Sequence, residues 1–303
     1  MKTEIPAIPE FLDMELLARL PSLEIQARFL VQGFLSGMHR SPLRGFNVEF
    51  KEYRSYGPGD EPRTIDWKVY ARTDRLQVKV REEDTNLTAY LIVDASASMN
   101  YRSAGAVMSK WDFTRSLAAA MILMFQRQRD AASLAVLGAG PLQFIYPSLK
   151  VSVHRHMMAA LDRQADGPGG SLAEGLARMV PLTRRRSLLF VLSDFYEDPA
   201  AFDTPIRQLR HDGTETIFLH VLDPEELNFG FDQPVLLQEL ETHNRLPLSP
   251  DLLRREYLQK LAAHRQAIAR TAQSYGGDYQ LIRTDEPPYQ AMGAYLARRK
   301  GAL

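Results

Sequence analysis

Three oxygen-bearing side chains alternate with small residues in the segment Asp94-Ala-Ser-Ala-Ser-Met. On a loop that leaves a strand, Asp94, Ser96 and Ser98 can converge on one point, because the small residues between them let the loop curl tightly. Ligands that are all oxygen suit a hard cation such as Mg²⁺ or Mn²⁺, which binds about six oxygens at ~2.1 Å. The segment therefore predicts a divalent-metal site.

Two later segments carry side chains that such a site needs. Gly169-Gly170-Ser171 offers a hydroxyl at the start of a predicted helix, and Ser193-Asp194 offers a second carboxylate at the end of a predicted strand. Two carboxylates and three hydroxyls roughly neutralise a divalent ion and leave one coordination position for an Asp or Glu of a partner. The predicted metal ligands are Asp94, Ser96, Ser98, Ser171 and Asp194.

Other interpretations of this loop stay open. Asp94 and Ser96 are residue types that cap helices, so they could serve only to start the next helix. The same carboxylates could instead serve a metal-dependent phosphoester hydrolase. A vestigial metal site in a pure scaffold is a further possibility.

The surrounding pattern predicts an α/β fold. Apolar runs over 89–94, 187–193 and 216–222 are typical of buried parallel strands, and 279–282 is a last, shorter strand. Helical stretches are expected over 111–127, 151–163, 171–180, 200–211 and 253–268, with a hairpin formed by 132–137 and 142–146 and a final helix at the carboxyl terminus. Strands that alternate with helices predict a doubly wound, mostly parallel sheet flanked by helices, in which ligands bind at the carboxyl ends of the strands.

Residues 1–85 do not follow this alternation of strands and helices. One or two short amphipathic helices are expected over 13–37, with a break near Pro21, and short strands over 48–54 and 76–82 with a helical turn over 65–72. We therefore predict an N-terminal helical and β extension over 1–85, packed on a main domain over 86–303.

Composition excludes several classes of function. Lys plus Arg equal Asp plus Glu at 37 each, so the whole chain offers no electrostatic footprint for nucleic acid or an anionic membrane. There are no cysteines, which excludes disulfides, thiolate metal sites and cysteine nucleophiles. The first twenty residues are acidic and contain prolines, unlike a signal peptide. We expect a soluble, cytoplasmic protein with no membrane span.

The metal constellation resembles the metal-ion-dependent adhesion site of von Willebrand factor A domains, although Ser171 stands where that site usually has Thr. A second set of residues resembles the family called domain of unknown function 58, and it includes the segment Asp223-Pro-x-Glu226-Leu227. Its upstream members are Phe50, Tyr53, Arg54, Tyr56, Pro58, Gly59, Asp60, Arg63, Ile65, Asp66, Trp67, Lys68, Ala71, Arg72 and Thr73.

This resemblance implies a von Willebrand factor A-like fold with the five metal ligands named above. Family members are often encoded beside MoxR-type AAA+ ATPases and are thought to act as adaptors in metal-dependent assembly or chaperone-like remodelling. We therefore expect a non-enzymatic adaptor that uses Mg²⁺, or Mn²⁺ or Ca²⁺, to capture an acidic residue of such an ATPase or its client.

Two smaller groups of residues have unassigned roles. Arg54 to Arg72 mixes basic and acidic side chains around Trp67, which suits either a half-buried ion-pair network or a contact surface for a partner. His154 and His156 lie two apart on a predicted helix and point to different faces, so they make a poor metal pair and are expected at the surface.

Overall fold

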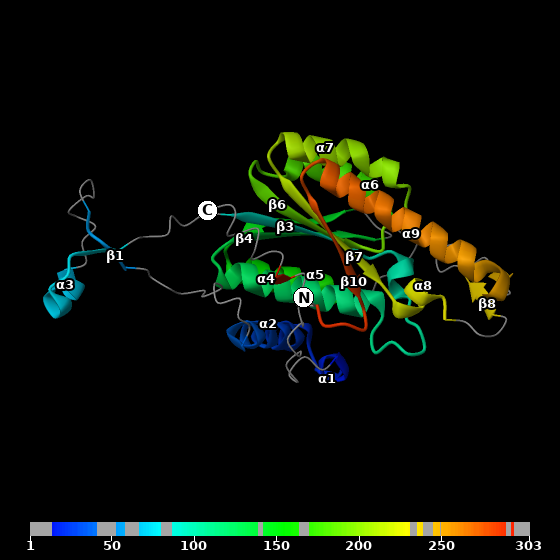
Figure 1. The fold of residues 1–303 in the computed structure, drawn as a ribbon, viewed down its shortest axis with the longest axis horizontal. Coiled ribbons are helices and arrows are strands. Elements are labelled where there is room, and N and C mark those ends of the chain that lie inside the picture. The colour runs from blue at the N-terminus through cyan, green and yellow to red at the C-terminus, as the bar shows by residue number, and fades with distance from the viewer. Residues whose placement is uncertain are drawn as a thin grey trace, which may run out of the picture.

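A six-stranded sheet organises the protein (Figure 1). The computed structural model describes residues 14–40, 53–57, 67–79, 87–138, 142–163, 170–230, 235–238, 245–248, 250–288 and 292–293. The strands of the sheet are β3 (Thr88–Asp94), β4 (Ala131–Leu137), β5 (Gln143–Ser148), β6 (Ser187–Ser193), β7 (Glu215–Leu222) and β10 (Asp278–Arg283).

The order of the strands indicates at which edge of the sheet a ligand would bind. They lie in the order β10-β7-β6-β3-β4-β5, and all neighbours are parallel except β5, which returns antiparallel to β4. The chain builds outward from β3 in one direction and from β6 in the other, so the order reverses between these two strands. In doubly wound sheets this reversal opens a crevice at the carboxyl ends of the strands, where ligands bind.

Helices cover both faces of the sheet, which confirms the predicted fold class (Figure 1). The antiparallel pairing of β4 with β5 also confirms the predicted hairpin. The helices of the first face are α4 (Lys110–Arg127) and α5 (Val151–Leu161), and those of the second face are α6 (Leu172–Met179), α7 (Asp203–His211) and α9 (Pro250–Ser274).

Strand β3 shows why the sheet needs helices on both faces. All seven of its residues are buried. Ala89, Leu91 and Val93 pack in the apolar cluster that includes α4, whereas Tyr90 and Ile92 pack in the cluster that includes α6, α7 and α9. A strand with side chains buried on both sides has a continuous apolar sequence, as this one does.

Two N-terminal helices form an extra layer against α4. They are α1 (Met14–Arg19) and α2 (Leu23–Arg40), separated near Pro21 as predicted. Leu30 of α2 is 1% exposed and belongs to the same apolar cluster as α4. The Ser116 hydroxyl of α4 donates a 2.7 Å hydrogen bond to Oε1 of the buried Gln26. Apolar packing and a buried polar contact thus attach α2 to the main domain.

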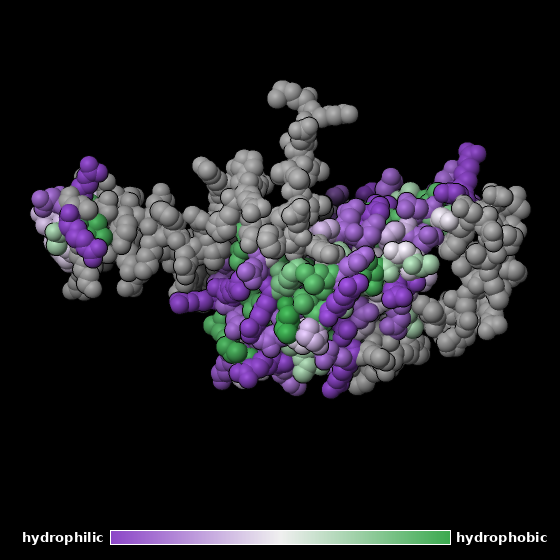
Figure 2. Space-filling view, turned by 90° about the horizontal axis from the view of Figure 1, so that it is seen from below, coloured by the Kyte–Doolittle hydropathy of each residue, from purple (hydrophilic) through white to green (hydrophobic). Residues whose placement is uncertain are grey.

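The outer side of this layer is mainly polar. Figure 2 looks onto the molecule from the side of α1 and α2 and shows hydrophilic residues over most of the described surface, with a smaller apolar area near its middle. Leu16 and Ile25 are 46% and 43% exposed. A few exposed apolar side chains are ordinary on a protein surface.

A small separate unit contains β1 (Tyr53–Ser55), α3 (Trp67–Thr73) and β2 (Gln77–Lys79). Its two strands pair antiparallel, and in Figure 1 the unit lies away from the six-stranded sheet. Trp67 is 60% exposed and Arg72 is exposed, so neither belongs to a half-buried network. Asp60, Arg63 and Asp66 lie outside the described residues, as does 58–66 as a whole. The domain boundary near residue 85 stays a prediction.

The structure adds elements that the sequence patterns did not indicate. They are a short helix after β7, α8 (Pro224–Asn228), and an antiparallel pair, β8 (Val235–Gln238) with β9 (Arg245–Leu248). Most of the predicted C-terminal helix falls outside the described residues. None of the described helices combines the length and apolarity needed to cross a bilayer.

The expected exposure of His154 is wrong, although His156 is exposed as predicted. His154 is only 3% exposed, and its Nε2 lies 2.9 Å from the Ser148 carbonyl oxygen. The imidazole therefore has a structural role, since it binds the end of β5 to α5.

The turn between α9 and β10 yields a test of the packing. A Cβ atom at Gly277 would lie 2.6 Å from the Thr216 carbonyl oxygen and 2.9 Å from that of Ala272. We expect Gly277→Ala to lower the free energy of unfolding by about 1–3 kcal/mol, because backbone atoms must move. Urea unfolding measures the change. Gly105→Ala is the control, since no heavy atom beyond its two chain neighbours lies within 4 Å of its Cβ position; equal stability of both variants would contradict the prediction.

Candidate metal site

Asp94 ends β3 and connects two loops at the carboxyl edge of the sheet. Its side chain is buried, with the residue 7% exposed. Oδ1 accepts a 2.9 Å hydrogen bond from the Ser96 backbone N–H, and Oδ2 accepts a 2.6 Å bond from the Ser193 hydroxyl. The first bond curls the chain after β3, and the second binds this loop to the end of β6.

The two serines of the motif lie side by side. The hydroxyl oxygens of Ser96 and Ser98 are 3.0 Å apart and share a hydrogen bond. Ser96 occupies the N-cap position of a short 3-10 helix, η2 (Ala97–Asn100), but its side chain makes no capping bond. The hydroxyls therefore gather next to Asp94, and the interpretation of Ser96 as a simple helix cap does not describe its contacts.

Asp194 follows β6 directly and brings a second carboxylate close to Asp94. It is 2% exposed, and its Oδ2 accepts a 2.8 Å bond from Nζ of Lys110. Burial raises the pKa of Asp94 to about 6, with a further contribution from the negative charge of Asp194, against the hydrogen bonds from Ser193 and Ser96. Asp94 and Asp194 thus place two negative charges close together in a buried environment.

The residue after Asp194 fixes the turn in which it lies. Phe195 has a φ of +51°, a conformation that is uncommon for residues other than glycine. Its ring is fully buried, 4.8 Å from the ring centroid of Phe218 and 5.8 Å from that of Phe202. Its carbonyl oxygen accepts a 2.8 Å bond from Nε2 of His264 in α9. Core packing and α9 together hold the turn in this unfavourable conformation.

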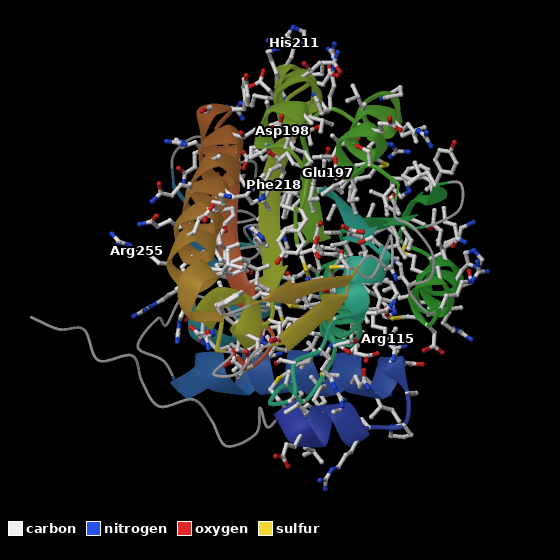
Figure 3. All side chains as sticks on the ribbon, turned by 90° about the vertical axis from the view of Figure 1, so that its right-hand side faces the viewer. Arg115, Glu197, Asp198, His211, Phe218 and Arg255 are labelled. Carbon is white, nitrogen blue, oxygen red and sulfur yellow. The ribbon has the colours of Figure 1, made fainter. Side chains whose placement is uncertain are left out.

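Ser171 is engaged elsewhere. It is the N-cap of α6, where its oxygen accepts a 3.2 Å bond from Glu174 N–H, and its hydroxyl donates a 2.9 Å bond to Glu197. The Glu197 carboxylate also accepts hydrogen bonds from the backbone N–H groups of Leu172 and Ala173. Figure 3 looks onto this edge of the sheet and shows Glu197 beside α6. An acidic side chain at a helix N-terminus is favourable because the exposed N–H groups carry partial positive charge.

The loop that carries Ser171 nevertheless borders the Asp94 loop. A Cβ atom at Gly170 would lie 3.8 Å from the Gly138 carbonyl oxygen, and one at Gly138 would lie 3.4 Å from that of Ala95. The structure therefore brings Asp94, Ser96, Ser98 and Asp194 together, and it brings Ser171 to the neighbouring loop with its hydroxyl on Glu197.

Sequence reasoning missed four participants: Ser193, Lys110, Glu226 and Glu197. For Lys110 a signal existed. It is the first residue of α4, directly after the N-cap Ser109, and a cation is disfavoured at this end of a helix unless anions surround it. Glu226 belongs to the Asp-Pro-x-Glu-Leu segment noted above. Nothing in the local sequence distinguishes Glu197 from a surface glutamate.

The donors present fit a hard divalent cation. They are all oxygen, and the buried pair Asp94 and Asp194 gains most from a nearby positive charge. Within the described stretches, no group of three or more His, Cys, Asp and Glu side chains has a metal-binding arrangement. A metal at this edge would therefore depend on two carboxylates supplemented by the hydroxyls of Ser96 and Ser98, which lie beside Asp94.

The raised pKa of Asp94 predicts how stability changes with pH. At pH values between 3.8, the ordinary pKa of Asp94, and about 6, the folded protein keeps a proton on Asp94 that the unfolded chain has lost. The free energy of unfolding therefore falls as pH rises through this range and stays low above it. A shift of this size corresponds to about 3 kcal/mol. In EDTA, we expect Asp94→Asn to be more stable than wild type at pH 8 by up to this amount, because an amide carries no charge.

Urea unfolding at pH 5 and pH 8 measures this difference. Asparagine retains an acceptor for Ser96 N–H and can donate to the Ser193 oxygen, so the loop geometry is kept. Asp162→Asn, on an aspartate whose side chain is 69% exposed, is the control. The same pH dependence in wild type and Asp94→Asn would show that Asp94 does not carry the effect.

The contacts of Glu197 yield a second prediction. Glu197→Ala removes the acceptor for two backbone N–H groups and for the Ser171 hydroxyl. We expect a loss of about 1–3 kcal/mol in the free energy of unfolding, with faster amide hydrogen exchange at Leu172 and Ala173. Glu197→Gln, which keeps an acceptor oxygen, should lose less. Unchanged exchange at both amides in Glu197→Ala would contradict this role.

Known proteins resemble this chain in sequence over most of its length. An uncharacterized protein of Mycobacterium tuberculosis is 31% identical over 300 residues, which covers 96% of this chain and 92% of that protein. Solved structures with a similar arrangement include an aerotolerance-related membrane protein from Bacteroides fragilis, with a TM-score of 0.49, 10% identity and coverage of 70% of this chain and 99% of that one. Another is the SpRpn10 VWA domain, with a TM-score of 0.41, 11% identity and coverage of 69% and 95%.

The sequence model of the family described as "Protein of unknown function DUF58" matches residues 52–267. That range includes β3, β6 and all the candidate ligands, as well as the upstream segment around Trp67. The chain belongs to the DUF58 family.

Proposed function

We propose that this protein is a metal-dependent protein-binding adaptor and not an enzyme. The observation that carries the proposal is the meeting of two buried carboxylates, Asp94 and Asp194, where the strand order reverses, with the hydroxyls of Ser96 and Ser98 beside Asp94. An all-oxygen set of this kind suits Mg²⁺, and also Mn²⁺ or Ca²⁺.

The ion's role would be to present positive charge at the edge of the protein. Asp94 and Asp194 would anchor the ion, and Ser96 and Ser98 would add neutral oxygens. Ser171 would join only after its hydroxyl leaves Glu197. A shell that the protein fills incompletely leaves a position for a carboxylate from another molecule, so the partner would contribute an Asp or Glu.

The partner is proposed to be a MoxR-type AAA+ ATPase or a client of such an ATPase, in the cytoplasm. Membership of the DUF58 family supports this choice, because the resemblance described above associates the family with these ATPases. The role would be assembly or remodelling, with ATP hydrolysis supplied by the partner, since the chain has no Gly-x-x-x-x-Gly-Lys-Ser/Thr segment.

The proposal predicts that Asp94→Ala abolishes metal binding and metal-dependent capture. Isothermal titration calorimetry with Mg²⁺ and with Mn²⁺ measures the first effect on the purified full-length chain. A pull-down with a purified MoxR-type ATPase from the source organism, in Mg²⁺ and in EDTA, measures the second. Asp162→Ala serves as the matched control, because it removes an exposed carboxylate that pairs with Arg115 and not with any candidate ligand.

We expect wild type and Asp162→Ala to bind the ion and to retain the ATPase in Mg²⁺ alone, and Asp94→Ala to do neither. Metal binding that survives Asp94→Ala would disprove the site. Metal binding without retention of the ATPase would support the metal site and exclude this ATPase as the partner. Mg²⁺-dependent cleavage of p-nitrophenyl phosphate, lost in Asp94→Ala, would favour the phosphoester hydrolase over the adaptor.

A further inference from the structure

Lys110 is a buried cation within the candidate metal site. Its side chain is 0% exposed, and Nζ lies 2.8 Å from Asp194 Oδ2 and 2.7 Å from Glu226 Oε1. Burial alone would favour the neutral amine, but the two carboxylates keep the pKa of Lys110 above its ordinary value. One of the two carboxylates proposed to anchor the metal is thus already shared with an ammonium group.

The Lys110 ammonium group has contacts on several sides and is shielded from solvent. The Tyr196 ring lies 5.0 Å from Nζ and the Tyr101 ring lies 5.9 Å from it, both at cation–π distances. Glu226 is itself fixed, because its other oxygen accepts a 2.8 Å bond from Asp223 N–H in the capping box of α8. Loops after β3, β6 and β7 therefore fix Lys110 in place.

The charges at this edge decide what Lys110 does to a metal ion. Asp94, Asp194 and Glu226 contribute three negative charges against the one positive charge of Lys110, a sum of −2 over these four groups, and the carboxylates of Asp223 and Glu225 add to the negative surroundings. Burial lowers the pKa of the adjacent His220 to about 3, so this imidazole adds no charge at neutral pH. A divalent ion brings the sum over the first four groups to zero, whereas without Lys110 that sum would be −1, so Lys110 makes the loaded site less negative by one charge.

We propose that Lys110 is an internal counter-ion that shares Asp194 with the divalent metal, and that it thereby weakens metal binding and offsets one negative charge of the loaded site. This inference rests on the proposed function. A positive charge at hydrogen-bond distance from a metal-binding carboxylate repels the ion and occupies one of the two carboxylate oxygens. A less negative loaded site accepts the carboxylate of a partner more readily than a more negative one.

Removal of the positive charge at Lys110 should therefore tighten metal binding. The test is a titration of the full-length protein with Mn²⁺ at pH 8, with free Mn²⁺ followed by electron paramagnetic resonance. We expect Lys110→Met and Lys110→Gln to bind Mn²⁺ at least ~10-fold more tightly than wild type, since a like charge is lost at short range. Lys260→Met, which removes an exposed lysine paired with Glu256, should change the affinity less than ~2-fold.

Glu226→Gln should act in the opposite direction. It leaves Lys110 with Asp194 as its only charged partner among those described, so the ammonium group holds that carboxylate more strongly. Mn²⁺ affinity should fall by ~3–10-fold. A purely structural role for Lys110 would weaken Mn²⁺ binding in Lys110→Met, Lys110→Gln and Glu226→Gln alike, because each of these three disturbs the same buried network. Opposite signs for Lys110→Gln and Glu226→Gln are therefore the signature of a shared counter-ion.

The outcomes separate this inference from the proposed function. Binding by wild type, with equal or weaker affinity in folded Lys110→Met or Lys110→Gln, would overturn the counter-ion role and leave the metal site intact. No Mn²⁺ binding by wild type would overturn the metal site and the counter-ion role with it. Circular dichroism establishes which variants fold. If neither lysine variant folds, unchanged or tighter binding in Glu226→Gln overturns the inference, and weaker binding supports it.

Discussion

The repulsion between two buried carboxylates is the constraint on which this edge of the protein depends. Asp94 ends β3 and Asp194 directly follows the neighbouring parallel strand β6, so the pairing of these strands brings the two carboxylates together in a buried place. Each carboxylate is satisfied differently: Asp94 by a backbone N–H and a hydroxyl, and Asp194 by an ammonium group. The loops after β3, β6 and β7 follow from the need to supply these partners, since an unpaired buried charge is costly.

The same constraint explains why apparently unrelated segments are connected. The N-terminus of α4 supplies Lys110, and α8 supplies Glu226 through a capping box. The N-terminus of α6 is covered by Glu197, which also holds the Ser171 hydroxyl. Helix ends meet the sheet at its carboxyl edge because right-handed crossovers start there. Their partial charges and caps thus become part of the electrostatics of the site.

Sequence patterns predicted the elements with strong periodicity and the residues with an obvious chemistry. The apolar run of β3 and its terminal Asp94 identify both a central strand and a candidate ligand, because a strand buried on two faces leaves few other interpretations. The partners of Lys110 could not be predicted, since residues 84 and 116 positions away supply them. The prediction that His154 is exposed was wrong, because the local sequence indicates neither its burial nor its hydrogen bond to the end of β5.

Phe195 connects the site to the interior in a way that no ligand residue does. Its ring is buried against Phe202 and Phe218, while its backbone, in a left-handed conformation, sets the turn directly after Asp194. A change of side-chain volume deep in the core would be transmitted through one aromatic ring to a carboxylate at the edge. In evolution, the core residues packed beneath α9 and the residues of the candidate metal site therefore cannot vary independently. Compensating substitutions are expected between these two groups of residues.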